Sequence, residues 1–231
     1  AGLRRLLTFD MGGTSTDVGL CDGFIPMTSQ TTISGWPVKI PMIDIHTIGA
    51  GGGSIAELDS GGALQVGPAS AGADPGPVCY GKGAAVTVTD ANLFLGRLLP
   101  DNFLGGHLKL HKERCRQAVE HLAGKAGLSP RNLAEGIIEV VEENMAAALR
   151  VVSIERGFDP RDFTLFPFGG AGGLHACSLA EKLGTPRVFI PVFPGLLSAV
   201  GMLLAPPLRD YSCSVLANSG AGKIDFEDIY A

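Results

Sequence analysis

The chain has 231 residues, of which 45% are hydrophobic and 18% charged, and its formal net charge is −5. This composition excludes an intrinsically disordered chain, and the absence of a lysine or arginine cluster argues against nucleic acid as a partner. Glycine is the unusual component, with 33 residues, about 14% against an average near 7%. The glycines gather in short runs, which allow tight turns and let the backbone approach a ligand closely.

Cysteine spacing and hydropathy bear on the compartment. The five cysteines show no C-x-x-C spacing, which favours a reduced, cytoplasmic protein, and no signal peptide is recognised at the N-terminus. Residues 189–208 carry no charge, but four prolines interrupt them and leave about ten helix-like residues, too few to span a bilayer. We expect a strand end, a proline-rich turn and a short buried helix there, and no membrane contact.

The first half of the chain reads as strands. Four are predicted before the first long glycine run, at residues 6–10, 17–21, 31–40 and 42–48. Residues 49–83 form a glycine-rich loop insertion, with one hairpin around Gly61 and Gly62 whose arms are 55–59 and 63–66. These features predict a sheet that begins with hairpins.

The second half alternates helices and strands. A short helix is expected after a cap at Thr89 or Asp90, and Ser129 and Pro130 begin a long one. The predicted elements are helices at 112–126, 131–156 and 174–183 and strands at 163–168 and 187–191. Hairpins followed by alternating helices and strands predict an α/β fold, a mixed sheet with packed helices.

The stretch "FDMGGTSTDV" places a carboxylate at the end of an apolar strand, directly before two glycines and three hydroxyl residues. The backbone N–H groups of such a turn can hold an anion, and the hydroxyls add donors. Asp10 and Asp17 can hold Mg²⁺ through its waters or orient an attacking water. The turn is not a Walker A loop, since no lysine follows the glycines. Chemistry alone leaves a plain β-hairpin with a polar tip as an equal alternative.

A second stretch, "LFPFGGAGGLHA", again runs from a strand through glycines into a helix. The N-terminus of a helix suits an anion, and bare glycine backbone suits the flat face of a base. Two such turns in one chain suggest a nucleotide held between them.

These two stretches resemble the phosphate and adenosine motifs of the actin, sugar kinase and Hsp70 ATPase superfamily. Longer strings are similar to the hydantoinase A/5-oxoprolinase family, which includes acetone carboxylase subunits; they include "DIHTIGAGGGSIAELDSGGALQVGPASAGADPGPVCYG", "VTDANLFLGRL", "RVVSIERGFDPRDFTLFPFGGAGGLHA" and "PGLLSAVGMLLA". The resemblance covers about residues 6–210. It implies an RNase H-like lobe of the actin/Hsp70 type and a reaction that depends on Mg²⁺ and ATP.

The resemblance also implies site residues. Asp10, Gly12, Gly13, Thr14, Ser15, Thr16 and Asp17 would contact phosphate or its magnesium, and Gly169, Gly170, Ala171 and Gly172 would pass beside adenosine. Asp44 and His46, two apart on a predicted strand, would line the reactive site or bind a second divalent metal beside Asp10. The alternative for this pair is a hydrogen-bonded structural role beside a turn.

The implied reaction is the hydrolysis of a cyclic amide, of hydantoin or 5-oxoproline type, after ATP phosphorylates the carbonyl oxygen. A subunit of an ATP-dependent ketone carboxylase and a non-enzymatic Hsp70- or actin-like switch are the alternatives. Family chains carry a further Asp-x-Gly-Gly-Thr turn in an N-terminal half, so we expect residues 1–231 to be a single lobe from a longer chain. The expected partner is a hydantoinase B-type subunit or domain.

Other polar residues are expected to be structural. Asp90 is expected to cap a helix, and Glu142 and Glu143 to form part of a polar helix face. His175 is expected to pack or cap a helix start, and Cys79 is left without a role. His107 and His111 have helical zinc-ligand spacing but no third ligand, so no metal is expected there.

Overall fold

The computed structural model describes residues 2–29, 31–33, 35–207 and 209. The chain divides into two compact units, Ala1–Ser198 and Ala199–Ala231. All the features below except the end of the last helix belong to the first unit.

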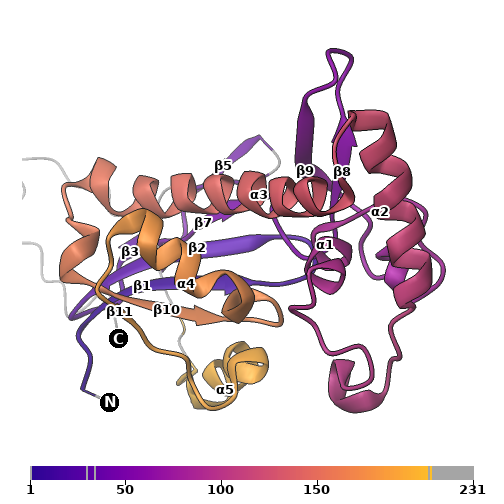
Figure 1. The fold of residues 1–231 in the computed structure, drawn as a ribbon. Helices are drawn as coiled ribbons and strands as arrows, with labels where there is room; N and C mark the ends of the chain where they lie inside the picture. Colours follow the sequence, from indigo (N-terminus) through magenta and orange to yellow (C-terminus); the bar gives the residue numbers. More distant parts are fainter. Residues whose placement is uncertain (1, 30, 34, 208, 210–231) are drawn as a thin grey trace, which may run out of the picture. The chain divides into compact units, whose positions relative to one another are not determined.

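The centre of the first unit is a five-stranded sheet with the order β11-β10-β1-β2-β7 (Figure 1). Its strands are β1 Arg5–Met11, β2 Thr16–Asp22, β7 His46–Ile48, β10 Thr164–Phe168 and β11 Arg187–Val188. The β1–β2 and β2–β7 pairs are antiparallel, whereas β1, β10 and β11 run parallel. The prediction of a mixed sheet that begins with hairpins is therefore confirmed.

Two helices, α3 Pro130–Val152 and α4 Gly172–Leu183, lie side by side on one face of this sheet (Figure 1). That face carries Leu7, Phe9 and Met11, alternate residues of β1 that are fully buried. Helix α4 contacts β1, whereas α3 contacts β2 and β7. The members of the apolar stripe of α3 from Leu133 to Val152 are also buried. Asp10 lies between two of these core residues and therefore points to the other face.

A smaller group of elements gathers at the end of the sheet where β1 ends and β2 begins (Figure 1). It contains the hairpin β8 Ser54–Leu58 and β9 Leu64–Ser70, the helices α1 Val88–Phe94 and α2 Lys112–Ala126, and the short 3₁₀ turns η1 Val78–Tyr80 and η2 Phe103–Gly106. The hairpin confirms the prediction around Gly61 and Gly62. Chain segments far apart in sequence thus surround the first glycine turn.

The long predicted strands at 31–40 and 42–48 are wrong as continuous elements. They form short pieces, β4 Thr31–Ile33, β5 Trp36–Val38 and β6 Met42–Ile43, and β3 Met27–Thr28 pairs with β6. Gly35, which has a positive φ, turns the chain between β4 and β5. The break before β7 leaves Asp44 outside any strand.

Helix boundaries differ from prediction where side chains cap the backbone. The α1 cap is Thr87, and Asp90 lies inside the first turn, where both complete a capping box. Helix α3 starts as predicted after Ser129 but ends at Val152, where the Ser153 hydroxyl donates to the Leu149 carbonyl at 2.6 Å. A separate turn, η3 Ile154–Arg156, then leads to Gly157.

The remaining elements are η4 Pro160–Asp162, η5 Pro194–Leu196 and α5 Leu197–Leu204. The expectation that the last helix is buried is wrong, since Met202, Leu203 and Leu204 are exposed. Within the described part of the chain, no helix combines the length and the apolar character needed to cross a membrane.

Candidate functional site

The first glycine turn, Gly12 to Ser15, is built against a second glycine run at 51–53. Gly52 N–H donates to the Gly12 carbonyl at 3.0 Å, and Gly53 N–H donates to the Gly13 carbonyl at 2.6 Å. A Cβ on Gly51 would stand 2.7 Å from the Thr14 backbone nitrogen. The two backbones are thus stacked at a spacing that only glycine permits.

The other glycine turn, Gly169 to Gly172, contacts the C-terminal end of β1. Ala171 N–H donates to the Met11 carbonyl at 3.0 Å. Gly169 has a φ of +81°, and a Cβ there would collide with the Asp10 carboxylate. Helix α4 starts directly afterwards at Gly172, without a side-chain cap.

These turns share one wall of a cavity of about 470 Å³. Backbone from both turns and from Gly52 lines it, together with side chains from α1 to η2 and from η1; the lining residues are Gly12, Gly13, Gly52, Tyr80, Thr89, Arg97, Leu98, Leu99, Asn102, Phe103, Leu104, Gly170, Ala171 and Leu174. The volume lies within the range of small-molecule pockets. Residues of both glycine turns thus line one cavity, and the binding of a nucleotide between them stays a prediction.

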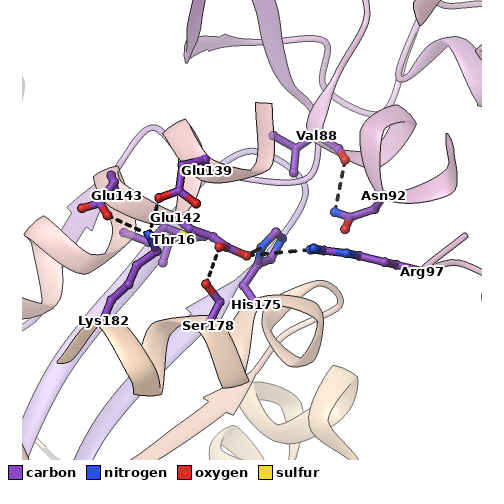
Figure 2. Close-up of polar contacts among 11 residues, drawn as sticks. Thr16, Val88, Asn92, Arg97, Glu139, Glu142, Glu143, His175, Ser178 and Lys182 are labelled. Carbon is purple, nitrogen blue, oxygen red and sulfur yellow. Dashed lines mark hydrogen bonds and ion pairs between the residues drawn. The ribbon is translucent and has the colours of Figure 1, made fainter. Parts of the chain in front are cut away.

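Arg97 is the single charged residue among those that line the cavity. Its Nη1 lies 3.9 Å from Oε1 of Glu142, which comes from the middle of α3 (Figure 2). Glu142 is only 3% exposed. The sequence pattern placed Glu142 on a polar helix face, but its side chain is buried against α4.

Glu142 is held by two residues of α4. His175 Nδ1 lies 3.0 Å from Oε1, and the Ser178 hydroxyl donates to Oε2 at 2.5 Å (Figure 2). Burial raises the pKa of Glu142, but the hydrogen bonds from His175 and Ser178 and the charge of Arg97 outweigh it and lower the pKa overall. Glu142 is thus a buried carboxylate that stays ionised at neutral pH. Its partner His175 is fully buried, and no residue of the described chain bonds to its Nε2.

Asp10 and Asp17 face each other across β1 and β2, on the sheet face away from α3. The Ser198 hydroxyl donates to Asp10 Oδ2 at 3.0 Å, and the Thr47 hydroxyl donates to Asp17 Oδ1 at 2.5 Å. Burial raises the pKa of Asp10; the Ser198 hydrogen bond lowers it by less, and the charge of Asp17 raises it further. A carboxylate in this position is stabilised by a cation, so the pair fits Mg²⁺, which needs only one or two carboxylates beside waters and phosphates.

The other residues expected at phosphate are placed differently. Gly12 and Gly13 line the cavity, whereas Thr16 is fully buried and its hydroxyl donates to the Ala50 carbonyl at 2.5 Å. Thr16 therefore joins the first turn to the glycine run. Thr14 and Ser15 lie in the turn itself but do not line the cavity, and their contact with phosphate stays a prediction.

Asp44 and His46 are not brought together with Asp10. Asp44 forms an ion pair with Arg156, with Nη1 at 2.5 Å from Oδ2. His46 pairs with Val18 in the sheet and so lies on the α3 face, opposite Asp10 and Asp17. No cluster of three potential metal-binding side chains occurs within the described residues. A catalytic or metal-binding role for Asp44 and His46 stays a prediction.

Asp90 has a structural position that supports the cavity wall. Its fully buried carboxylate accepts from the backbone N–H groups of Val78, Cys79 and Thr87 and from the Thr87 hydroxyl, at 2.8–3.1 Å. It thereby joins the turn that carries Tyr80 to the start of α1. Next to it, burial and then the Asp90 charge raise the pKa of the Cys79 and Cys115 thiols, that of Cys115 to about 12. This agrees with leaving Cys79 without a chemical role.

Arg97, Glu142 and Ser178 were missed from sequence. Arg97 lies in the stretch "VTDANLFLGRL", but no local sequence pattern indicates that its side chain lines a cavity. One signal was available for Glu142: its position continues the apolar stripe of α3, four residues after Ile138 and three before Met145.

Comparison with known proteins gives the following matches. The family described as Hydantoinase/oxoprolinase matches residues 1–211. The caprolactamase subunit alpha of Pseudomonas jessenii is 47% identical over 207 residues, which are 88% of this chain and 30% of that protein. The 5-oxoprolinase of Dictyostelium discoideum is 43% identical over 232 residues, 93% of this chain and 18% of the relative.

Among solved structures, a nucleotide-free acetone carboxylase, described in terms of ATP-dependent acetone carboxylation, matches with a TM-score of 0.80. It is 35% identical and covers 87% of this chain and 29% of its own. The chain thus spans about a third or less of the length of the relatives it matches.

Proposed function

The chain belongs to the hydantoinase/oxoprolinase family, and from this premise we propose that it supplies the nucleotide-binding lobe of an ATP-dependent enzyme that hydrolyses a cyclic amide. The observation that carries the proposal is the cavity where Gly12 and Gly13 meet Gly170 and Ala171. The relatives named as caprolactamase and 5-oxoprolinase support the substrate class.

The residues suit the two ends of ATP. The bare backbone of Gly12, Gly13 and Gly52 would let phosphates approach closely, since no side chain stands in the way. The N–H groups of Gly12 and Gly52 already donate to the Ser15 and Gly12 carbonyls, so the N–H of Gly13 is the one proposed to bind phosphate. Asp10 and Asp17 would hold Mg²⁺, which neutralises phosphate charge when bound. The apolar side chains from Leu98 to Leu104 would exclude water around the rest of the nucleotide.

In the proposed reaction the terminal phosphoryl group of ATP moves to the amide carbonyl oxygen, and ADP leaves. Water then adds to the carbonyl carbon and the C–N bond breaks with proton transfer to nitrogen, which leaves an acyl phosphate. A second water hydrolyses this acyl phosphate to the carboxylic acid and inorganic phosphate. Activation is needed because an amide is a poor electrophile. A second polypeptide would supply part of the substrate site, in keeping with the "subunit alpha" name of the caprolactamase relative.

Ketone carboxylation is the second candidate, supported by the acetone carboxylase structure. ATP-dependent turnover distinguishes the two in the complete enzyme that contains this chain. Ring opening of hydantoin or 5-oxoproline without bicarbonate supports the hydrolase, and a requirement for bicarbonate and a ketone supports the carboxylase.

The first test is calorimetric titration of the chain with Mg-ATP, beside Asp10→Ala. We expect saturable binding that requires Mg²⁺ and is weakened by the substitution. Asp22→Ala is the matched control, because Asp22 lies at the far end of β2 and pairs with Arg5. Absence of binding at millimolar ATP, or equal binding by wild type and Asp10→Ala, would contradict the proposal.

A further inference from the structure

The cavity has two chemically different walls. The glycine turns present backbone with no side chain, which suits phosphate oxygens. The segment after α1 presents Arg97 among Leu98, Leu99 and Phe103. An arginine in apolar surroundings can either clamp an anion or stack on a flat ring, and its own partners decide which.

The positive charge of Arg97 is already compensated by a carboxylate of the protein itself. Glu142, 3.9 Å away, is its single ion-pair partner within the described chain. The Arg97 side chain lines the cavity and is 41% exposed, while Glu142 is buried. A polyphosphate placed at Arg97 would also meet the negative charge of Glu142, which offsets the attraction.

Glu142 cannot move away to release Arg97. Its two oxygens are bonded to His175 and Ser178, which lie three residues apart on the face of α4 that meets α3. The carboxylate is therefore fixed by a helix pair, and its charge lies 3.9 Å from the guanidinium (Figure 2).

We propose that Glu142 is a positioning residue that holds Arg97 as a charge-compensated platform for the base of the nucleotide, so that phosphates bind at the glycine turns. This assignment rests on the proposed function, and it adds which end of the ligand lies at Arg97 and why. A guanidinium plane stacks well on an aromatic base, and compensation of its charge lowers its preference for an anion.

The test separates the two ends of the ligand by NMR titration with adenosine and with inorganic tripolyphosphate. In Glu142→Gln we expect adenosine to bind roughly fivefold more weakly, because Arg97 loses its anchor. Tripolyphosphate should bind about threefold more tightly or more, because the guanidinium charge is no longer offset. A purely structural role would weaken both ligands alike, and that result or unchanged binding of both would overturn the proposal.

Two controls sharpen the result. Glu143→Gln removes the same charge one residue further along α3, where Glu143 pairs with Lys182 and Arg150, and it should change neither ligand. In an Arg97→Ala background, Glu142→Gln should no longer affect adenosine, since its effect passes through Arg97.

A ligand-free measurement keeps this proposal separate from the proposed function. The Arg97 Nε–H group should be rigid in ¹⁵N relaxation of the wild type and mobile in folded Glu142→Gln. Equal mobility in both would overturn the positioning role, even if ATP binds. Failure of the wild type to bind ATP, adenosine or tripolyphosphate would overturn the proposed function and the base platform together.

Discussion

Glu142 is a buried carboxylate and Asp10 a half-buried one, and their surroundings shift their pKa values in opposite directions. Glu142 is the more deeply buried, yet its pKa is lowered, because His175 and Ser178 donate to both oxygens and Arg97 is near. Asp10 is less buried, yet its pKa is raised, because the effect of burial exceeds that of its one hydroxyl donor, Ser198, and the charge of Asp17 adds to the rise. The number of partners, more than depth, decides which charge the fold tolerates.

The difference separates two kinds of polar residue. Glu142 and Asp90 have their lone pairs occupied by the protein, so they hold helices and turns in place. Asp10 has one hydroxyl donor and faces a second carboxylate, which costs stability and would favour the binding of a cation. Four substitutions test this division, and they are taken from the largest expected effect to the smallest.

Asp90→Ala should be the most damaging change. It leaves three buried backbone N–H groups, those of Val78, Cys79 and Thr87, without an acceptor. We expect a loss of about 3–5 kcal/mol in the free energy of unfolding, measured by urea titration. Asp74→Ala, which removes an exposed carboxylate paired with Lys82, should cost less than about 0.5 kcal/mol. Equal effects of the two would show that Asp90 is not a structural anchor.

Gly169→Ala tests the space around Asp10. Its φ of +81° disfavours any side chain, and the new Cβ would press on the Asp10 carboxylate and the Met11 carbonyl. We expect a loss of about 2–4 kcal/mol in urea unfolding and a loss of Mg-ATP binding.

Gly170→Ala is the matched control for this change. Gly170 is the next residue, its φ is not positive, and no atom lies within 4 Å of a Cβ built there. Its stability should change by less than about 1 kcal/mol. If Gly169→Ala and Gly170→Ala lose the same free energy of unfolding, the close approach of Gly169 to Asp10 is not what requires glycine at position 169.

Sequence patterns predicted much of the fold and part of the site. Alternation in β1, the Ser129–Pro130 start of α3 and the glycine turns are local signals, so they were read correctly. Glu142 and Arg97 were missed because their roles depend on contacts 33 to 45 residues apart in sequence. Asp44 was placed on a strand because the pattern carries no sign of its pairing with Arg156, which lies 112 residues away.

Glu142→Gln should destabilise the fold in a pH-dependent way. The folded pKa of Glu142 lies below its unfolded value of 4.5, so the ionised form contributes stability above pH 4.5 that is lost as pH falls through the folded pKa. We expect the variant to lose about 1–3 kcal/mol at pH 7 and progressively less below pH 4.5, in urea unfolding at several pH values. A deficit independent of pH would indicate a change in packing and not the loss of the charge.

Asp10→Asn should give the smallest effect and the opposite sign. The folded pKa of Asp10 lies above its unfolded value of 3.8, so the ionised form costs stability above the folded pKa, and this cost disappears as pH falls below 3.8. Because Asp10 is partly exposed, solvent screening limits the expected gain for the variant to a few tenths of a kcal/mol at pH 7, with none at pH 3.

The same Asp10→Asn variant should bind Mg-ATP more weakly, since it loses the charge that holds the cation. For Asp10→Asn, stability would then rise while Mg-ATP binding falls. For Asp90→Ala both should fall, because Asp90 holds the turn that carries the cavity residue Tyr80. Thermal unfolding with and without Mg-ATP measures both quantities in one series. A variant less stable than wild type at pH 7 would mean that Asp10 is held as firmly as Glu142, and the division between the two carboxylates would fail.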